Sequence, residues 1–503
     1  MTIPYDYDYD TDVLIAGAGP TGSTLAADLL RRDVAVRLID KAHHAFQGSR
    51  AKGIQPRTQE ILEDLGILHE AHTQGSRYPL AGLHLGPLTL PWRMQQNHRP
   101  TPDVPYPNIL LLPQHRTDAL LHSLLHHHGL DIEFDTAVAH FTQDSDGVTT
   151  TLADGSTVRS RYLVGADGGA STVRKHTGLD FTGHTDNTDR TLLIDATIAD
   201  LPRNRWHIWP RTHGTSAAAC PLPHSDQFQI MIKLRPGQDP DLDHTALAST
   251  FHTLTGLHLR EITWTSVFRP NVRLVEHYRT GRVLLAGDAA HVHTPAGAQG
   301  LNTGVQDAYN LGWKLAQVLA GAPDALLDTY ETERRPVAAH VLGKSSELYQ
   351  NLSRHRLSGL KRGDEERQLT LSYRGGPLAG TGTTRTLAAG DRAPDAPCLT
   401  ADGARRLFDL LRGTHFTLLA FGNAPTGLPW PETGAELHAY RVVRRPGNGG
   451  EIADTSGKLT RTYGVDGDAL VLIRPDGYIA DVSTTRDDAG FAEAIRALAL
   501  TPS

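Results

Sequence analysis

The chain has 503 residues and a formal net charge of −7, which is length enough for about three domains. Its 49 Lys and Arg against 56 Asp and Glu argue against a nucleic-acid partner, and no apolar run approaches the length of a membrane span. The two cysteines, Cys220 and Cys398, are far apart with no C-x-x-C, which excludes disulfide scaffolds and thiolate metal sites. We expect a cytoplasmic protein without a metal.

The chain begins with a strand, a glycine turn and a helix. Residues 12–16 form a short apolar run, helical spacing follows over 23–32, and a second buried strand at 34–39 ends at Asp40. Three glycines spaced as G-x-G-x-x-G separate the first strand from the helix, namely Gly17, Gly19 and Gly22. This order is typical of a dinucleotide-binding unit, in which backbone N–H groups reach a pyrophosphate and the acid accepts ribose hydroxyls. The motif does not separate FAD from NAD.

Periodicity predicts the next elements. Apolar residues at helical spacing indicate helices over 56–68 and 118–128. Alternation over 146–164 predicts a hairpin whose second strand leads into the turn at Asp167. Between about 180 and 275 the pattern is mainly that of β-strands, so we expect a separate sheet there.

The buried-strand pattern returns at 282–286 and is followed by Asp288, a glycine-rich loop and a helix pattern from Asn302 to about residue 320. An acid directly after a buried strand is where α/β sheets place ligand-binding residues. Asn302 is the expected N-cap of the helix, whose positive end would then face a bound cofactor. The chain thus returns to its first domain.

The remainder of the chain divides into a crossing segment and a terminal unit. Residues 354–395 are rich in Arg, Gly, Thr and Pro, which indicates a linker or a loosely packed crossing. Beyond it, apolar runs at 416–421 and 469–473 predict strands, and a closing helix is expected at 487–500. A strand-rich α/β unit of about 110 residues follows from this pattern.

Together these motifs resemble the FAD-dependent aromatic hydroxylases of the p-hydroxybenzoate hydroxylase class, the group A flavoprotein monooxygenases. The stretch 282–314 is similar to their second FAD-binding motif, and 166–174 is similar to their Asp-Gly motif. The resemblance covers residues 12–345. More weakly, the C-terminal unit resembles the thioredoxin-like domain of the branch that acts on aromatic polyketides and rifampicin.

The resemblance implies an α/β fold with three parts. A Rossmann-like FAD-binding domain would comprise residues 1–180 and 276–385, with a substrate-binding sheet domain inserted at 181–275. A thioredoxin-like domain without C-x-x-C would comprise residues 386–503. Three aromatic residues of the sheet region are pocket candidates, with core packing an equal alternative: Trp206, Trp209 and Phe268.

The resemblance also implies FAD contacts. Asp288 would bond a ribityl or ribose hydroxyl, Arg50 would contact the pyrophosphate, and Gln114 the flavin. Asp167 and Arg174 would serve FAD and the passing nicotinamide nucleotide. The loop beside the isoalloxazine would include Pro295, Gly297, Gly300, Leu301 and Asn302.

Two positions depart from the family pattern. Asp40 stands where Glu is usual, and Ala298 stands where a second glycine is common. The shorter acid keeps the same chemistry, and the alanine would move one backbone N–H slightly away from the flavin. We expect FAD binding to survive both changes.

The implied activity is that of an NAD(P)H-dependent monooxygenase. NADPH or NADH would reduce FAD, O2 would form a C4a-hydroperoxide, and one oxygen would pass to a small aromatic substrate, a polycyclic polyketide-type phenol or quinone. The flavin carries the chemistry, so no catalytic side chain is predicted. A Baeyer–Villiger oxygenase, an FAD dehydrogenase or reductase without oxygen transfer, and a flavin-binding protein without turnover stay open. So does the oligomeric state, a homodimer included.

Overall fold

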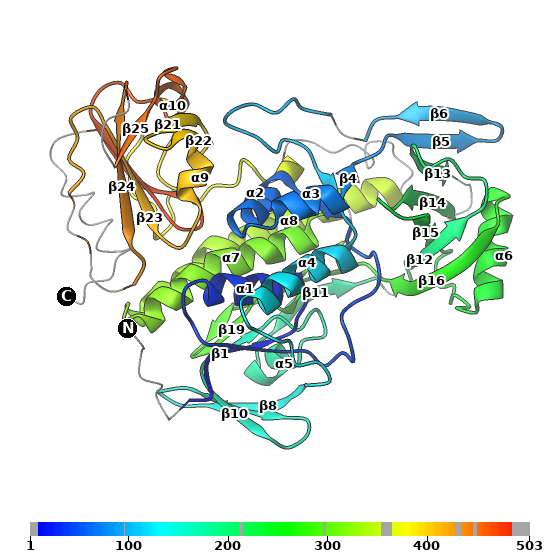
Figure 1. Ribbon diagram of the computed structural model, residues 1–503. Coiled ribbons are helices and arrows are strands. Elements are labelled where there is room, and N and C mark those ends of the chain that lie inside the picture. Colours follow the sequence, from blue (N-terminus) through cyan, green and yellow to red (C-terminus); the bar gives the residue numbers. More distant parts are fainter. Residues whose placement is uncertain are drawn as a thin grey trace.

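The computed structural model describes residues 9–484 except 95, 187, 211–214, 295–297, 354–364, 428–429, 431–433 and 446–449, and omits the side chains of 348–353 (Figure 1). The predicted helix at 487–500 lies outside the described residues, as do Pro295 and Gly297. None of the described helices is long and apolar enough to cross a membrane.

A mainly parallel sheet forms the centre of the first unit. Its spatial order is β18 (Arg279–Thr280), β19 (Val283–Leu285), β10 (Thr157–Gly165), β1 (Thr11–Ala16) and β2 (Val36–Ile39). The antiparallel strands β9 (Val148–Leu152) and β8 (Val138–Gln143) extend it from β10. The strands predicted at 12–16, 34–39 and 282–286 and the predicted hairpin are therefore confirmed. The buried apolar residues of β1 and β10 place them at the centre of the core.

Helices cover this sheet, and two of them differ from the prediction. The helices α1 (Pro20–Leu30), α4 (Gln114–His127) and α7 (Gly300–Leu319) lie side by side (Figure 1). A single helix over 56–68 was expected, but Gly66 adopts a φ of +82° and separates α2 (Pro56–Asp64) from α3 (Leu68–Gln74). The start of α7 at Gly300, with Gln299 at the N-cap, shows that the prediction of Asn302 as the N-cap is wrong. The long helix α8 (Asp328–Ser353) packs on α7.

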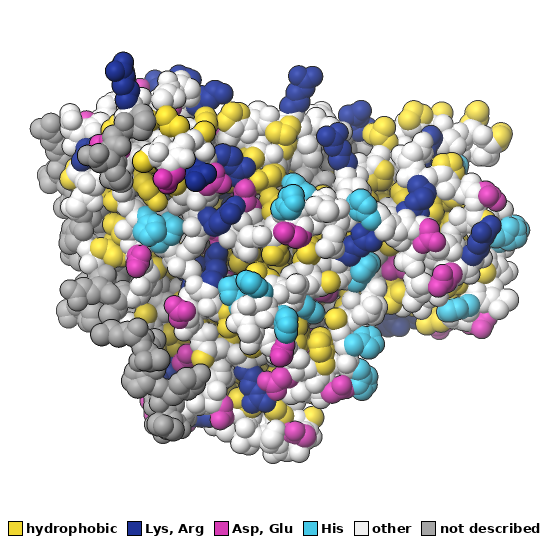
Figure 2. Space-filling model, in the orientation of Figure 1, with side chains coloured by type: hydrophobic (Ala, Val, Ile, Leu, Met, Phe, Trp, Pro, Cys, Tyr) yellow, Lys and Arg dark blue, Asp and Glu magenta, His cyan; other side chains and the backbone are white. Residues whose placement is uncertain are grey.

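The β-rich region forms a seven-stranded sheet larger than expected. Its order is β16 (Leu259–Phe268), β12 (Thr191–Ile198), β15 (Gln227–Lys233), β14 (Ser216–Pro221), β13 (Trp206–Pro210), β5 (Ala81–Leu85) and β6 (Leu88–Trp92). The last two strands come from outside 180–275. They belong to this sheet because β5 pairs in parallel with the distant β13. Helix α6 (His244–Thr255) covers one face. The hairpin β5–β6 projects from the molecule (Figure 1) and exposes leucines. Hydrophobic side chains, yellow in Figure 2, gather over this part of the surface.

Two small sheets join these parts. One contains β11 (Phe181–Thr185), β17 (Asn271–Val275) and β20 (His291–Val292). The other contains β3 (Gly53–Ile54), β7 (Leu110–Leu111) and β4 (Ser76–Arg77). Short helices also occur at α5 (Thr172–Thr177) and at the 3-10 turn η1 (Gly287–Ala289).

The C-terminal unit is a mixed sheet with two short helices, α9 (Leu407–Leu411) and α10 (Lys458–Thr462). Its order is β22 (Gly403–Arg406), β21 (Pro397–Thr400), β25 (Glu451–Ala453), β24 (Leu437–Val443), β23 (Phe416–Phe421), β26 (Ala469–Ile473) and β27 (Ile479–Ser483). The preceding segment is not the loose crossing that was predicted, within its described part. Tyr373 and Leu378 are buried there, and the Gln368 side chain is hydrogen-bonded to that of Gln299 beside α7.

Candidate active site

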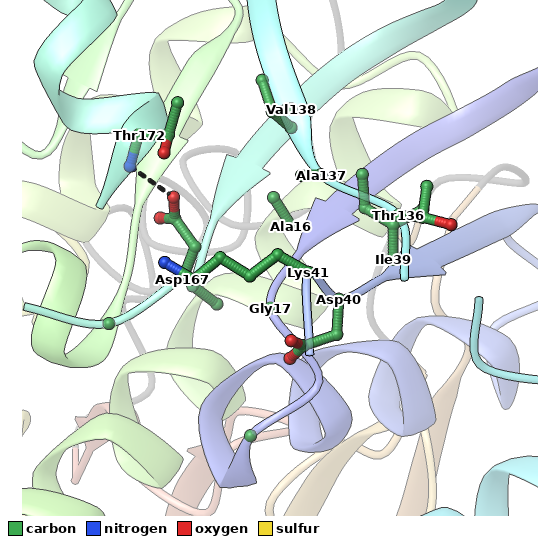
Figure 3. Close-up of a pocket in the computed structure, with 13 residues that line it drawn as sticks. Ala16, Gly17, Ile39, Asp40, Lys41, Thr136, Ala137, Val138, Asp167 and Thr172 are labelled. Atoms are coloured by element: carbon green, nitrogen blue, oxygen red, sulfur yellow. Dashed lines mark hydrogen bonds between the residues drawn. The ribbon is translucent and has the colours of Figure 1, made fainter. Parts of the chain in front are cut away.

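A cavity of about 210 Å3 lies at the carboxyl ends of β1 and β2. Figure 3 shows Asp40 and Asp167 in its wall, with the Lys41 side chain extending between them. Residues of the glycine turn and of the segment at the start of β8 also line it, among them Gly17, Gly19, Thr136, Ala137 and Val138. This edge is where parallel α/β sheets bind nucleotides.

The three glycines of the turn have different reasons to be glycine. Gly17 has a φ of +106°, and a Cβ there would overlap the backbone of Ala166. A Cβ on Gly22 would overlap the carbonyl oxygen of Gly17. At Gly19, by contrast, no atom lies within 4 Å of the Cβ position, and its φ of −72° suits any residue. Protein packing therefore demands Gly17 and Gly22, whereas Gly19 leaves open space beside the N-terminus of α1 for a phosphate.

Asp40 is held rigidly at the end of β2. Its Oδ2 accepts a hydrogen bond from Ala18 N at 2.7 Å, and its Oδ1 accepts one from Ala42 N at 2.9 Å. Each carboxylate oxygen can accept a second bond. The protein therefore fixes the orientation of the carboxylate, and its oxygens can still accept hydrogen bonds from ribose hydroxyls in the cavity.

A second acid, Asp118 on α4, lies near Asp40. It is 2% exposed, and burial raises its pKa to about 8, with the Asp40 carboxylate acting in the same direction. A hydrogen bond to Gln114 opposes this shift. The Gln114 Oε1 also accepts a long hydrogen bond from Ala51 N at 3.5 Å. Gln114, the first residue of α4, thus contacts the segment that carries Arg50.

Asp167 and Arg174 make their hydrogen bonds within the protein. The Asp167 carboxylate accepts bonds from the backbone N–H groups of Thr172 (2.6 Å) and Val173 (3.2 Å) and so caps α5. Arg174 donates to the carbonyl oxygens of Gly169 and Ala289, each at 2.9 Å. These bonds tie the Asp-Gly turn to the 3-10 turn that carries Asp288.

The loop before α7 is fixed by Asn302. Its Nδ2 donates to Gly53 O at 2.8 Å and Ala298 O at 2.7 Å, and its Oδ1 accepts from Gln55 N at 2.8 Å. Both N–H donors of the amide and one acceptor position are engaged with backbone groups, so the side chain holds the loop in place. Ala298 adopts a φ of +54°, a left-handed conformation that costs a non-glycine residue about 1 kcal/mol.

Asp288 is exposed and lies at the N-terminus of α7. Its Oδ1 is 4.0 Å from the Cβ position of Gly300, and Leu301 beside it is half-buried. Arg50 is also exposed, and its side chain makes no hydrogen bond or ion pair with the rest of the described chain. Both charged side chains remain available to a ligand.

The three aromatic pocket candidates do not lie together. Trp209 is 6% exposed and packs with Phe251 of α6 in the core of the sheet unit, so the core-packing alternative holds for this residue. Trp206 and Phe268 are half-buried, and the strand register places them on the opposite face of the sheet. The alternation of the strand separates Trp206 from Trp209.

Sequence reasoning missed part of the cavity wall. Thr136, Ala137 and Val138 line it beside Asp40, and Glu133 N–H, just before them, bonds to Leu38 O of β2. Three small or β-branched residues before an edge strand carry no motif. Only the approach of this segment to β2 reveals their place.

Comparison with known proteins agrees with this geometry. A family model described as an FAD binding domain matches residues 10–345, and one described as the C-terminal part of aromatic-ring hydroxylases matches residues 386–502. The chain therefore belongs to the FAD-binding aromatic-ring hydroxylase family and is a flavin-dependent monooxygenase. Its cofactor is FAD, and the open space at Gly19, the oriented Asp40 and the cavity between them fit the adenosine end of that group.

Individual relatives cover nearly the whole chain. A flavin-dependent monooxygenase of Mycobacteroides abscessus is 43% identical over 93% of this chain and 96% of its own length. The 6-methylpretetramide 4-monooxygenase of Streptomyces rimosus is 35% identical over 97% of this chain and 94% of its own. Aklavinone-11 hydroxylase, solved with FAD and aklavinone, superposes with a TM-score of 0.81 at 26% identity, covering 98% of this chain and 99% of its own.

Proposed function

We propose that this monooxygenase hydroxylates a polycyclic aromatic substrate of the polyketide type, with NADPH or NADH as the reductant. When FAD is bound and reduced by the nicotinamide nucleotide, it activates O2 for transfer of one oxygen atom to the substrate. The protein supplies the positions of cofactor and substrate and a site from which water is excluded. Relatives named for 6-methylpretetramide and aklavinone support this substrate class.

The observation that carries the proposal is an apolar row on the large sheet. Ile208, Ala218, Met231 and Leu193 are paired across four neighbouring strands. They share the face of the sheet on which Asp195 accepts a hydrogen bond from Ser49 of the FAD-binding unit, and all but Leu193 are half-buried. A flat line of apolar side chains with part of its surface uncovered suits a fused aromatic ring system.

We assign the roles of the site on the same basis. Asp40 would bind the adenosine ribose, the backbone at Gly19 and the Arg50 side chain the pyrophosphate, and Asp288 the ribityl chain. Gln114 and the backbone from Gly300 to Asn302 would approach the flavin ring. The division of the chain that the sequence predicted is retained, with β5 and β6 added to the sheet domain. Both cysteines are free and buried, which agrees with a cytoplasmic location.

The test is the oxidation of NADPH and of NADH by the FAD-loaded protein, recorded with O2 uptake, with and without a panel of phenolic polyketides. We expect one class of compound to accelerate nucleotide oxidation and to gain one oxygen atom, which ¹⁸O2 labels. The product structure from NMR must carry a new ring hydroxyl, because a Baeyer–Villiger product has the same mass. Flavin reduction at equal rates with no oxygenated product would favour the dehydrogenase alternative.

A further inference from the structure

A row of side chains crosses the large sheet next to the apolar row and on the same face. Strand register pairs Trp264 with Asp195, Asp195 with Gln229, and Gln229 with Cys220. The pairing of β13 with β14 continues this line to Trp206. Directly opposed residues on adjacent strands point to the same face, so these five residues form one line, which we call the cross-strand row.

The segment 48–52 of the FAD-binding unit lies along the cross-strand row. Gly48 packs against the indole of Trp264, where a Cβ would overlap the ring. Ser49 donates to Asp195 twice, from its backbone N at 2.7 Å and from its Oγ at 2.5 Å. Gln229 Nε2 donates to Ser49 Oγ at 2.6 Å and to Arg50 O at 3.3 Å. The sheet therefore holds the backbone at Ser49 and at Arg50 itself.

Lys52 also contacts the cross-strand row, although its amine is buried. It is 8% exposed, its Nζ donates to Gln229 Oε1, and it lies 4.7 Å from the centroid of the Trp206 ring. No carboxylate of the described residues is within ion-pair distance, and burial lowers the pKa of the amine. A buried ammonium without an ion pair is costly, and the hydrogen bond to Gln229 and the Trp206 ring offset part of that cost.

The same segment continues to the loop beside α7. Gly53 follows Lys52, its carbonyl accepts the bond from Asn302, and its Cα lies beside the Ala298 side chain. Between the sheet and this loop, Arg50 has the one charged side chain of the segment that makes neither a hydrogen bond nor an ion pair within the described structure, and it is exposed. The backbone that carries it is anchored at both ends.

We propose that Asp195 and Gln229 of the large sheet are positioning residues for FAD binding, because they hold Arg50 where its guanidinium meets the cofactor pyrophosphate. The inference rests on the role proposed above for Arg50. It makes cofactor affinity depend on side chains of the sheet domain that do not touch the cofactor. The buried side chains of Asp195 and Gln229 would then orient the exposed side chain of Arg50.

The test is a double-mutant cycle with Arg50→Ala and Gln229→Met, in which FAD binding to the apoprotein is titrated by flavin fluorescence. We expect each single variant to weaken FAD binding about tenfold. The double variant should bind FAD at most about twofold more weakly than the weaker-binding single variant. Asp195→Asn, a conservative change that removes one acceptor of the Ser49 pair, repeats the cycle in case Gln229→Met does not fold. Ile230→Val, on the same strand but facing the core, should lower thermal stability and leave FAD affinity unchanged.

Additive losses in the cycle would overturn the proposal, because Gln229 would then act independently of Arg50. An Arg50→Ala variant with unchanged FAD affinity would also overturn it, since there would be nothing to position. The titration uses neither substrate nor nicotinamide nucleotide. Coupled losses in a protein that oxygenates no aromatic compound would refute the proposed function and leave this inference intact.

Discussion

At the scale of single residues, Asp118 is a buried acid whose pKa lies far above its ordinary value. It is buried beside the adenosine cavity, and its Oδ1 has no hydrogen-bond partner in the described structure. Burial raises its pKa from 3.8 to about 8. At neutral pH the carboxyl of Asp118 is therefore protonated and adds no negative charge beside Asp40.

This shift predicts that Asp118→Asn raises the free energy of unfolding relative to the wild type, and that the difference depends on pH. The folded protein retains a proton that the unfolded chain releases between pH 4 and pH 8, so wild-type stability falls as pH rises through this window. The amide of asparagine does not titrate, so this loss of stability with rising pH is absent in the variant. We expect the variant to gain on the wild type by up to about 1.4 kcal/mol per pH unit in this window, as measured by urea unfolding of the apoprotein. Asp402→Asn, in an exposed turn, should show a constant difference, and a constant difference for Asp118→Asn would contradict the assignment.

At the scale of elements, the turn between β1 and α1 separates two demands on glycine. Packing against residue 166 and within the turn itself requires Gly17 and Gly22. Space for a ligand requires Gly19. The sequence motif alone does not distinguish the roles of these three glycines.

Two alanine substitutions distinguish these demands. Gly19→Ala should leave the melting temperature of the apoprotein unchanged and lower FAD affinity at least about tenfold, because its methyl group enters the space of the phosphate. Gly17→Ala should destabilise the apoprotein by at least about 2 kcal/mol, because it adds an overlap to an unfavourable φ. Calorimetry and fluorescence titration measure the two effects. Equal loss of stability in both variants would refute the distinction.

At the scale of the whole molecule, the C-terminal unit is built into the FAD-binding unit. Glu333 of α8 accepts bonds from Arg474 Nη1 at 2.6 Å and from Lys314 Nζ at 2.8 Å, and all three side chains are buried. A second buried contact joins Arg392 to Glu60 of α2. The turn between β26 and β27 thus completes the charge balance of α7 and α8.

Loss of one partner in this network should be severe. Arg474→Met leaves Glu333 and Asp476 buried with too little positive charge, which we expect to cost about 3–5 kcal/mol in urea unfolding. Arg385→Met removes an ion pair to Asp466 in which both side chains are more than 60% exposed, and it should change stability by less than about 1 kcal/mol. Similar small effects in both variants would show that the two units are energetically separable. The network also predicts that removal of residues 386–503 leaves an FAD-binding unit that does not fold.

The prediction of elements succeeded where the signal was local. The strands at 12–16 and 34–39 and the hairpin were found because buried runs and alternation are properties of neighbouring residues. The single helix at 56–68 failed at Gly66, whose left-handed φ ends one helix and starts another. The loose crossing failed because its residues are polar in sequence but are hydrogen-bonded to distant partners, as Gln368 is to Gln299.

The sequence by itself indicated a dinucleotide-binding unit, because glycine turns and acids at strand ends are short-range patterns, and the resemblance of its motifs to a known family implied FAD and the general chemistry. Tertiary structure alone decided which of these residues are free. It caps α5 with Asp167, engages Asn302 with backbone groups and turns Trp209 into the core. It also joins β5 to β13 and seats Lys52 on the large sheet. The physical reason is that contacts between segments more than a hundred residues apart depend on which strands pair and in what register, and this pairing leaves no local trace in the order of amino acids.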